Sequence, residues 1–399
     1  MNPHLDMLQP YPFEKLGKLK LGIQPPENLL PIGLYIGEPK HPTPRLITKA
    51  LIENLGGLSS YPATKGIPEL REALAAWLSR RFRLPGDAVD PERHVLPCAG
   101  TREALFSFAQ AVIDPRKQPL VLMPNPFYQI YEGAALLAGA EPYFLNTTAE
   151  TGYLPDFDDV PEEVCARCQL IYICSPGNPT GAVITPETHR KLIELAQRFD
   201  FVIASDECYS ELYNDEANPP PGLLQSAWEM GNTSFERCVV FHSLSKRSNA
   251  PGLRSGFVAG DADVLAKFLL YRTYHGCALS LPVQQASRAA WSDEAHVAEN
   301  RALYRQKFAA VHQVLSGVLE VAIPPAGFYL WPRTPGDDQA FARELFAEAN
   351  VTVLPGSFLS REAHGVNPGR NHVRMALVAT LEECLDAAGR IREFVQTRG

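Results

Sequence analysis

The stretch FHSLSKRSNAPGLRSGF, residues 241 to 257, carries a lysine at the end of a buried strand. An apolar run is followed at once by Ser243, Ser245 and Lys246, and Arg254 lies eight residues after the lysine in a glycine-bearing loop. A lysine taken alone is most often a solvated surface residue. A lysine, two hydroxyls and an arginine at the mouth of a buried strand indicate a binding site if the neighbouring strands end in similar groups.

Further short apolar runs alternate with amphipathic segments along the chain. They lie in HVLPCAG (94–100), PLVLMPNP (119–126), QLIYICSPGNPTG (169–181), FVIASDE (201–207) and SGFVAG (255–260). Such runs, separated by helical segments, predict parallel strands covered by helices on both faces. The predicted fold class is therefore α/β, with a large, doubly wound, mostly parallel sheet.

The character of the sequence changes near residue 285. A long helix is predicted for residues 283 to 317, and the short strands and helices that follow are typical of a smaller α+β unit. The proline-rich start shows no pattern of a helix or strand. We predict three segments: an extended N-terminal segment (1–45) that packs with the small unit, a large domain (46–285) and a small C-terminal domain (286–399).

Composition limits the partners of this 399-residue chain. Its formal net charge of -8 disfavours nucleic acid, which is bound through basic surfaces. No apolar run approaches the roughly 20 residues of a membrane-spanning helix, and Asp6 and Glu14 stand where a secretory signal would be basic and then apolar. We therefore expect a cytoplasmic protein with small-molecule partners and no membrane or nucleic-acid partner.

The eight cysteines predict neither a metal site nor a redox site. Most stand singly in apolar runs, as reduced core cysteines do. Cys165 and Cys168 have CxxC spacing, but no second pair or suitably spaced histidines accompany them. We predict no metal.

The polar groups at the predicted strand ends suit one ligand. Residues 100–102 (Gly-Thr-Arg) precede a helix, so its N-terminal N–H groups are free for an anion, and Ser243, Ser245 and Arg254 would complete a phosphate site. Each cluster taken singly could be ordinary turn chemistry. Five such clusters at predicted strand ends, at residues 100–102, 125–126, 178–181, 206 and 243–246, favour a site.

Asp206 and Lys246 extend this ligand beyond a phosphate. A carboxylate at the end of a buried strand stays ionised only opposite a cation, such as the pyridinium nitrogen of a cofactor ring. A lysine in the same site could hold an aldehyde as a Schiff base. Phosphate, pyridine and aldehyde together make pyridoxal 5'-phosphate (PLP).

Four motifs in the expected order carry a family resemblance: YPATKGIPELREAL (61–74), NPTG (178–181), SDECY (205–209) and SLSK (243–246) with Arg254. Through them nearly the whole chain resembles the class I/II aminotransferases of PLP fold type I, the aspartate aminotransferase superfamily. Ser255 departs from the pattern, since the family usually has an aliphatic residue there. The resemblance implies a PLP-dependent transaminase.

The resemblance also implies roles around the cofactor ring. Lys246 would bond covalently to the cofactor aldehyde and move the proton of the substrate α carbon. Asp206 would pair with the pyridinium nitrogen, and Asn178 and Tyr209 would hydrogen-bond the phenolic oxygen. Tyr128 would stack on the ring, a role for which Phe127 and Tyr131 compete.

Further implied roles concern the phosphate, the subunits and the substrate. Thr101 and Arg102 would bind the phosphate mainly through backbone N–H groups, together with Ser243, Ser245 and Arg254. Tyr61 would reach the phosphate in a neighbouring subunit, which implies a homodimer with shared active sites. Gly37, Asn178 and Arg374 would bind the substrate, with Arg374 holding its α-carboxylate.

The segments LQPYPFEKL (8–16) and IGEPKHPTP (36–44) suggest a substrate. They most resemble bacterial N-succinyl-L,L-diaminopimelate aminotransferases of lysine biosynthesis, which implies 2-oxoglutarate and glutamate as the other substrate pair. Such a donor needs a second cation for its distal carboxylate, and Arg272 and His275 are the candidates in YRTYHGCALSLP (271–282).

Three alternatives stay open from the sequence. The chain could be an aminotransferase for another amino acid or a PLP-dependent C–S lyase on the same fold. It could also be a regulatory protein that senses PLP without catalysis. The known kind of regulator carries an N-terminal DNA-binding domain, and the roughly 45 residues before the large domain show no helix-turn-helix pattern.

Overall fold

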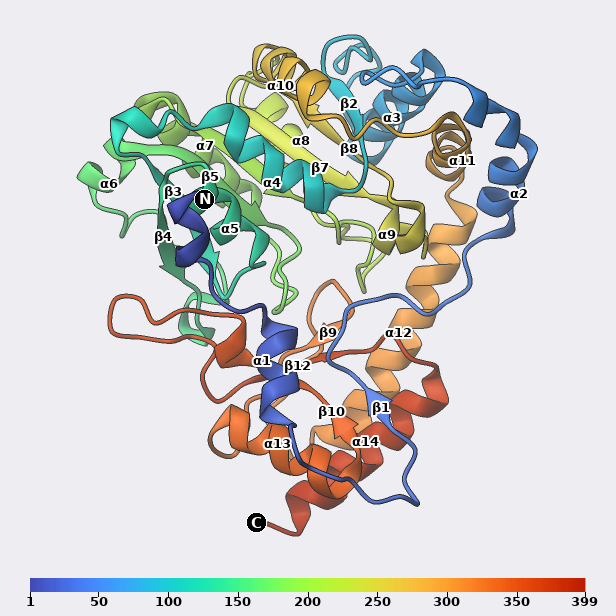
Figure 1. Ribbon diagram of the computed structural model, residues 1–399, viewed down its shortest axis with the longest axis vertical. Helices are drawn as coiled ribbons and strands as arrows, with labels where there is room; N and C mark the ends of the chain where they lie inside the picture. The colour runs from blue at the N-terminus through green and yellow to red at the C-terminus, as the bar shows by residue number, and fades with distance from the viewer. Residues whose placement is uncertain (399) are drawn as a thin grey trace.

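The upper part of the molecule in Figure 1 is organised around a seven-stranded sheet. The computed structural model describes residues 1–398, and its sheet has the strand order β2-β8-β7-β6-β5-β3-β4. Strand β8 runs antiparallel to its neighbours β2 and β7, and the other adjacent pairs are parallel. The strands are β2 (Val95–Cys98), β3 (Leu120–Asn125), β4 (Glu141–Asn146), β5 (Cys168–Cys174), β6 (Val202–Asp206), β7 (Cys238–Ser243) and β8 (Gly256–Gly260).

The predicted α/β class with a mostly parallel sheet is confirmed. The sequence missed two details: β4, and the reversed direction of β8. Strand β4 lies at the sheet edge, and its apolar run is short, mostly half-buried and flanked by Glu141 and Asn146, so it gives a weak strand signal. The direction of β8 follows from its short connection to β7, which contains only the short helix α9 (Leu244–Arg247) and the 3-10 turn η5 (Pro251–Leu253).

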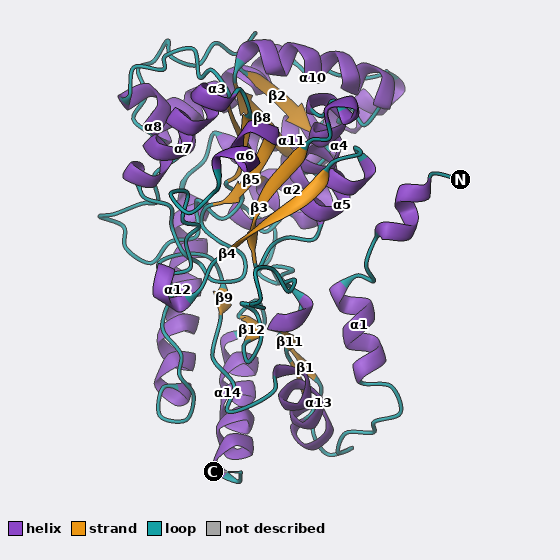
Figure 2. Ribbon diagram, turned by 90° about the vertical axis from the view of Figure 1, so that its left-hand side faces the viewer, coloured by secondary structure: helices purple, strands orange, loops and turns teal. Residues whose placement is uncertain are grey.

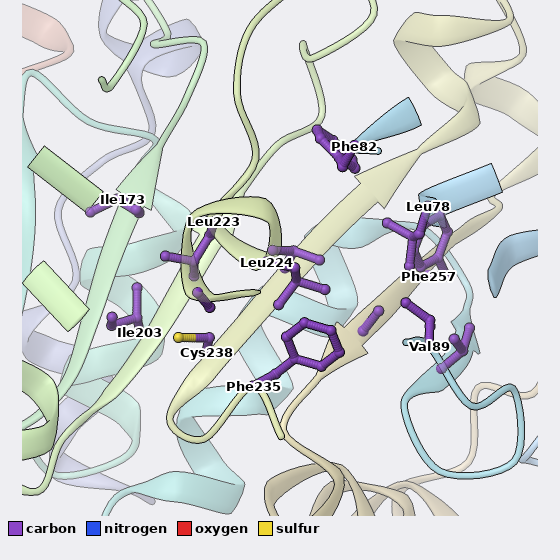
Figure 3. Close-up of a cluster of buried hydrophobic side chains, with 14 of the residues drawn as sticks. Leu78, Phe82, Val89, Ile173, Ile203, Leu223, Leu224, Phe235, Cys238 and Phe257 are labelled. Atoms are coloured by element: carbon purple, nitrogen blue, oxygen red, sulfur yellow. The ribbon is translucent and has the colours of Figure 1, made fainter. Parts of the chain in front are cut away.

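Helices cover both faces of this sheet, which is why its central strands are apolar on both sides. Figure 3 shows one face, where Ile173, Ile203 and Cys238 of three adjacent strands pack against Leu223 and Leu224 of α8. The helices of this part are α2 (Arg45–Glu53), α3 (Pro68–Arg81), α4 (Thr101–Val112), α5 (Ile130–Leu137), α6 (Glu162–Arg167), α7 (Pro186–Phe199), α8 (Leu223–Glu229), α9 (Leu244–Arg247), α10 (Ala262–His275) and α11 (Leu281–Trp291).

The opposite face of the sheet carries a second apolar cluster beneath α4 and α5. Phe108 of α4 lies edge-on to Phe241 of β7, with ring centroids 5.3 Å apart. Each such fully buried aromatic or aliphatic side chain contributes about 1.5 to 3 kcal/mol to folding. The two clusters together fix the sheet, and with it the strand ends at which the predicted site residues stand.

The lower part of Figure 1 is a smaller α+β arrangement. Strand β1 (Ile32–Gly33) pairs in parallel with β10 (Val351–Thr352), and β11 (Leu354–Pro355), β12 (Val373–Ala376) and β9 (Tyr329–Leu330) form an antiparallel sheet. The helices are α12 (Ala295–Leu315), α13 (Asp338–Ala349) and α14 (Leu381–Gln396). Their apolar faces enclose a separate core with the strands. The boundaries drawn from the sequence between large and small domains stay a prediction.

The predicted long helix over residues 283–317 is two helices, α11 and α12. The break at residues 292–294 has a partner in the short helix α9 (Leu244–Arg247), because Arg247 donates to the Asp293 carbonyl (3.1 Å) and to the Glu294 carboxylate (2.6 Å). The interrupted segment thus supplies acceptors for part of a buried guanidinium. None of the helices within residues 1–398 combines the length and apolar character needed to cross a membrane.

The N-terminal segment contains a helix that the sequence did not predict, α1 (Pro12–Leu19). Figure 2 shows the segment running along one side of the molecule, from the large sheet to the smaller part. The 3-10 turn Pro3–Met7 packs on α5, and α1 buries Leu16 beside β11. Proline at the first position of α1 explains the helix start, since its missing N–H is not needed there. The segment therefore contacts both parts of the molecule.

Candidate active site

A cavity of about 510 Å³ lies at the ends of the central strands, with walls from both parts of the molecule. Twelve of the predicted site residues line it: Gly37, Thr101, Arg102, Tyr128, Asn178, Asp206, Tyr209, Ser243, Ser245, Lys246, Arg254 and Arg374. The predicted residue Tyr61 is fully exposed and lies outside this cavity. Its role toward a neighbouring subunit stays a prediction.

Lys246 lies in the short helix α9, directly after β7. The Ser243 side chain caps this helix by accepting from the Ser245 N–H at 3.1 Å, which fixes the turn that carries the lysine. The Lys246 ammonium donates to the Gly37 carbonyl, and no carboxylate within residues 1–398 lies within 4.0 Å of it. Burial lowers the pKa of Lys246 to about 8. The amine is therefore mainly charged at neutral pH, but a larger fraction of it is free than in an exposed lysine.

Asp206 is a buried carboxylate without a cationic side chain within 4.0 Å in the described part of the chain. The Tyr131 hydroxyl donates to one oxygen at 2.7 Å, and the Cys208 N–H donates to the other at 3.2 Å. Burial raises the pKa of Asp206. Such a carboxylate suits a cation brought by a ligand, and a protonated ring nitrogen fits this requirement.

Tyr131 is a site residue whose role the sequence missed, because the resemblance offers it only as a ring-stacking residue. Its own ring lies parallel to Tyr172, with centroids 4.7 Å apart, and is fully buried. The stack aims the hydroxyl at Asp206. No local sequence signal distinguishes this tyrosine from a core aromatic.

The phosphate-binding prediction is supported by a cradle around Gly100. This glycine has φ +85°, and a Cβ on it would lie 2.2 Å from Nη2 of Arg254. Only glycine lets the guanidinium approach the start of α4, whose first residue is Thr101. Free N–H groups, the Ser243 and Ser245 side chains and Arg254 line the same end of the cavity. These residues fit the phosphate of the implied cofactor.

The Arg102 side chain makes contacts that the sequence could not assign. Its Nε donates to the Tyr128 hydroxyl at 2.7 Å, and its Nη2 donates to the Tyr11 hydroxyl at 3.3 Å. Both partners are neutral, and no carboxylate within residues 1–398 lies within 4.0 Å of the guanidinium. Arg102 therefore presents an unneutralised positive charge to the cavity.

Arg374 stands at the other end of the cavity. It is almost fully buried, and it donates to the Asn178 side-chain oxygen and to the Tyr35 carbonyl, both at 2.9 Å. Its Nε is buried without a hydrogen-bond partner, and its guanidinium lies 4.5 Å from the centre of the Tyr329 ring. A buried arginine with no carboxylate partner and an unused donor is suited to bind an anion.

Tyr329 is a second lining residue that the sequence missed. Its hydroxyl lies 3.1 Å from the Tyr209 hydroxyl, so the two phenols hold each other at the cavity wall. The same hydroxyl lies so close to Gly37 that a Cβ there would collide with it. The sequence showed only a short aromatic strand at this position, which is equally typical of a core.

The two sequence candidates for the distal cation, Arg272 and His275, do not line the cavity of this chain. Arg272 is buried, and its Nη1 donates to both Glu103 oxygens at 2.6 and 3.1 Å. His275, Cys277 and Glu103 bring three potential metal-ligating atoms together. The Glu103 carboxylate is already neutralised by Arg272, so neither a carboxylate reader nor a metal site is supported here.

A family model and a relative of known name both match most of this chain. Residues 31–391 match the family model for aminotransferase class I and II. An LL-diaminopimelate aminotransferase of Syntrophobacter fumaroxidans is 33% identical over 397 residues, which are 98% of this chain and 97% of the relative.

Two solved structures extend the likeness to the whole fold. An aminotransferase from Neisseria meningitidis is 51% identical with a TM-score of 0.95, and the match covers 99% of this chain and 100% of that one. A probable N-succinyldiaminopimelate aminotransferase from Thermus thermophilus is 29% identical with a TM-score of 0.83, over 96% of this chain and 99% of that one.

Proposed function

We propose that this chain, which belongs to the family of class I and II aminotransferases, transfers the amino group of a diaminopimelate-type donor to 2-oxoglutarate. The family and the fold make it a PLP-dependent aminotransferase of fold type I. The identity of the amino donor and of the acceptor is what we propose. The observation that carries it is the free guanidinium of Arg102 in a cavity that also holds Lys246, Asp206 and Arg374.

The cofactor is held by residues from several strand ends. Gly100, Thr101, Ser243, Ser245 and Arg254 would hold its phosphate, Asp206 its ring nitrogen, and Asn178 and Tyr209 its phenolic oxygen. Tyr128 and Cys208 would lie on its two faces. When bound, the cofactor supplies an aldehyde that bonds to amines and a protonated ring that withdraws electrons from the substrate α carbon.

Lys246 performs the proton transfer in this proposal. Its lowered pKa of about 8 leaves a useful fraction of free amine near neutral pH, so Nζ can take the proton from the substrate α carbon. The Gly37 carbonyl accepts from this amine when it is free. Asp206 would hold the proton on the ring nitrogen of a bound cofactor, and that positive charge would make the α proton more acidic.

The two substrate carboxylates bind to two different arginines that line the cavity. Arg374 binds the α-carboxylate, because its Nε has no other partner. Arg102 binds a distal carboxylate, because the two phenols that hold it leave its charge uncompensated. One charge-assisted contact of this kind stabilises binding by about 1.5 to 3 kcal/mol.

The N-succinyl derivative of L,L-diaminopimelate is our proposed donor. The two segments on which this inference rests, residues 8–16 and 36–44, both contribute to the cavity wall: Tyr11, Pro12 and Phe13 from the first, and Ile36, Gly37 and Glu38 from the second. Residues that resemble those of N-succinyl-diaminopimelate enzymes therefore lie where a donor side chain would be.

Free L,L-diaminopimelate is the second candidate, and Glu38 is the observation that favours it. This carboxylate lines the cavity and could accept from the distal ammonium, which the succinyl group would remove. The Syntrophobacter relative is named an LL-diaminopimelate aminotransferase, which also favours the free donor. The two donors differ in the charge of their distal end, so their relative rates separate the candidates.

The test is a comparison of kcat/KM for N-succinyl-L,L-diaminopimelate, free L,L-diaminopimelate, ornithine, aspartate and alanine, each with 2-oxoglutarate. We expect the succinyl donor to be about ten- to hundred-fold better than ornithine or alanine. Preference for the free form would move the assignment to L,L-diaminopimelate. A best rate with alanine or an aromatic amino acid would contradict any diaminopimelate assignment.

We also propose a homodimer and a cytoplasmic location. Tyr61 is fully exposed, and Ile52, Leu55 and Leu58 nearby are exposed apolar side chains, as expected for a surface that a second copy covers. All eight cysteines are free, which suits a reducing compartment. Light scattering of the holoenzyme tests the dimer, and a monomer at micromolar concentration would contradict it.

A further inference from the structure

Lys307 of α12 is a buried lysine without a carboxylate partner. Its side chain is 3% exposed, and no carboxylate oxygen in the described residues lies within 4.0 Å of Nζ. Its polar contact is Nε2 of His41, at 2.6 Å, and Nζ lies 5.1 Å from the centre of the Tyr304 ring. Burying an ammonium in this way is costly. The cost requires an explanation, and the sequence offered none.

The contact between Lys307 and His41 begins a chain of side chains that ends at Lys246. His41 Nδ1 lies 2.9 Å from the Asn300 side-chain oxygen, and the Asn300 amide donates to the Lys246 carbonyl at 3.2 Å. A charged lysine can only donate, so His41 Nε2 accepts and the proton of His41 is on Nδ1. His41 then donates to Asn300, whose amide group points at Lys246. Each hydrogen bond in this series therefore has a defined donor and acceptor.

The same series of hydrogen bonds joins two segments of the active site. Gly37 accepts from the Lys246 ammonium, and Thr43 donates to the Asn249 carbonyl at 2.7 Å. His41 lies between these two contacts and is tied through Asn300 to the backbone of Lys246. Residues 37–43, which form part of the cavity wall, are thereby held to residues 246–249 at three points.

We propose that Lys307 is a positioning residue, which acts through His41 and Asn300 to hold residues 37–43 against the backbone of the catalytic lysine. This inference rests on the proposed role of Lys246, and it adds three residues that do not touch the substrate. A charge-assisted hydrogen bond is stronger than a neutral one, which gives a reason for an ammonium at the start of the chain.

The protonation states fit this direction. Burial lowers the pKa of Lys307 to about 8, with Cys384 and Glu383 opposing and Lys40 adding to the effect, so the lysine is mainly charged at neutral pH. Burial also lowers the pKa of His41, while Asn300 opposes this and Lys307 adds to it. A charged Lys307 beside a neutral His41 is the arrangement that the hydrogen bonds require.

The first experiment compares Lys307→Met with Asn300→Ala and with the double variant. Because a small misplacement of a reacting group can cost about 100-fold, we expect each single variant to lose about 10- to 100-fold in kcat. If Lys307 acts through Asn300, the double variant is no slower than Asn300→Ala. A kcat for Lys307→Met within two-fold of the wild type, or losses that multiply in the double variant, would overturn the proposal.

A matched pair of variants at His41 tests the link itself. A glutamine amide presents an acceptor and a donor about as far apart as the two imidazole nitrogens, whereas phenylalanine keeps the ring shape without either. We expect His41→Gln to retain at least about a third of the wild-type kcat and His41→Phe to match Lys307→Met. Equal losses in both would show that the ring shape matters and the hydrogen bonds do not.

Hydrogen–deuterium exchange of the cofactor-free enzyme gives a readout independent of catalysis. Peptides covering residues 37–44 and 244–250 should exchange faster in Lys307→Met and His41→Phe, with peptides of β5 unchanged. Unchanged exchange in the two segments would overturn the proposal. If Lys246→Ala kept its activity, the proposed function would fail. Exchange would still test the hydrogen bonds from Lys307 through His41 and Asn300, because it does not depend on catalysis.

Discussion

The two ends of the cavity are assembled in different ways. The cofactor end, made by Thr101, Asp206, Lys246 and Arg254, comes from the ends of neighbouring strands of one sheet. The substrate end, made by Tyr11, Gly37, Arg102 and Arg374, draws mainly on residues near the two ends of the chain. A single sheet fixes the reaction chemistry, whereas specificity depends on how separate segments meet. The following variants test that division, beginning with the largest expected effect.

Lys246→Ala should lower turnover by at least about 10⁴-fold, because it removes both the covalent attachment point and the proton-transferring amine. The protein should still fold and bind the cofactor through Asp206 and the phosphate cradle. Turnover is measured with any active amino donor, and cofactor content by absorbance. Lys267→Ala, an exposed lysine on α10, is the control and should be unaffected. Residual turnover within ten-fold of the wild type would contradict the role of Lys246 at the cofactor end.

Asp206→Ala should lower kcat by about 10³-fold, because the ring loses the charge that keeps its nitrogen protonated. Asp206→Glu should retain more activity, since it keeps the carboxylate. Stopped-flow kinetics of the amino-donor half-reaction isolates this step from product release. Near-normal kcat in the alanine variant would mean that another group protonates the ring.

Arg374→Ala should lower kcat/KM about 100-fold for every amino donor, because all of them carry the α-carboxylate that this arginine is proposed to bind. The loss should be the same for alanine and for diaminopimelate donors. Steady-state kinetics with both donors checks this. A loss limited to the longer donors would place Arg374 at the distal carboxylate instead.

Arg102→Gln should lower kcat/KM about ten-fold for donors with a distal carboxylate and leave alanine almost unaffected. The glutamine can still donate to Tyr128 or Tyr11, so the cavity wall is expected to stay in place. Arg272→Gln offers the comparison, since Arg272 is neutralised by Glu103 outside the cavity. Equal losses for alanine and the long donors in Arg102→Gln would remove its role in specificity.

The last variant tests the stability of the protein and not its turnover. Burial lowers the pKa of His189 on α7 to about 4, so the unfolded chain binds a proton between pH 6.5 and 4 that the folded chain does not. Stability is therefore lost as the pH falls through this window, by about 3 kcal/mol from this group. His189→Asn should flatten the acid side of the stability curve, measured by urea unfolding. An unchanged slope would show that His189 does not titrate this way.

Twelve of the residues singled out from the sequence line one cavity, whereas several of their contacts were not predicted, and the reason is physical. Asp206 and Lys246 follow apolar strands directly, so strand order alone brings them together. Tyr329 and the partners of Arg102 depend on packing between segments that are distant in sequence. The helix α1 is not evident from the sequence because it is only eight residues long and lies in a proline-rich stretch.

Two further features depend on contacts between residues that are distant in sequence. The sequence offers Arg272 only as a candidate for the distal cation, and in this chain Glu103 of α4 neutralises it. The predicted long helix is broken at residues 292–294, where Arg247 donates to the Asp293 backbone carbonyl. Neither partner could be identified from spacing.

The central claim is that Lys246 holds the cofactor, and borohydride reduction of the holoenzyme followed by peptide mapping tests it most directly. Reduction fixes the cofactor to the lysine that carries it, and mass spectrometry then identifies the modified peptide. The account predicts a single modified site at Lys246, in the peptide that contains SLSK. Modification of Lys65 or Lys267, or a holoenzyme that reduction leaves unmodified, would contradict it.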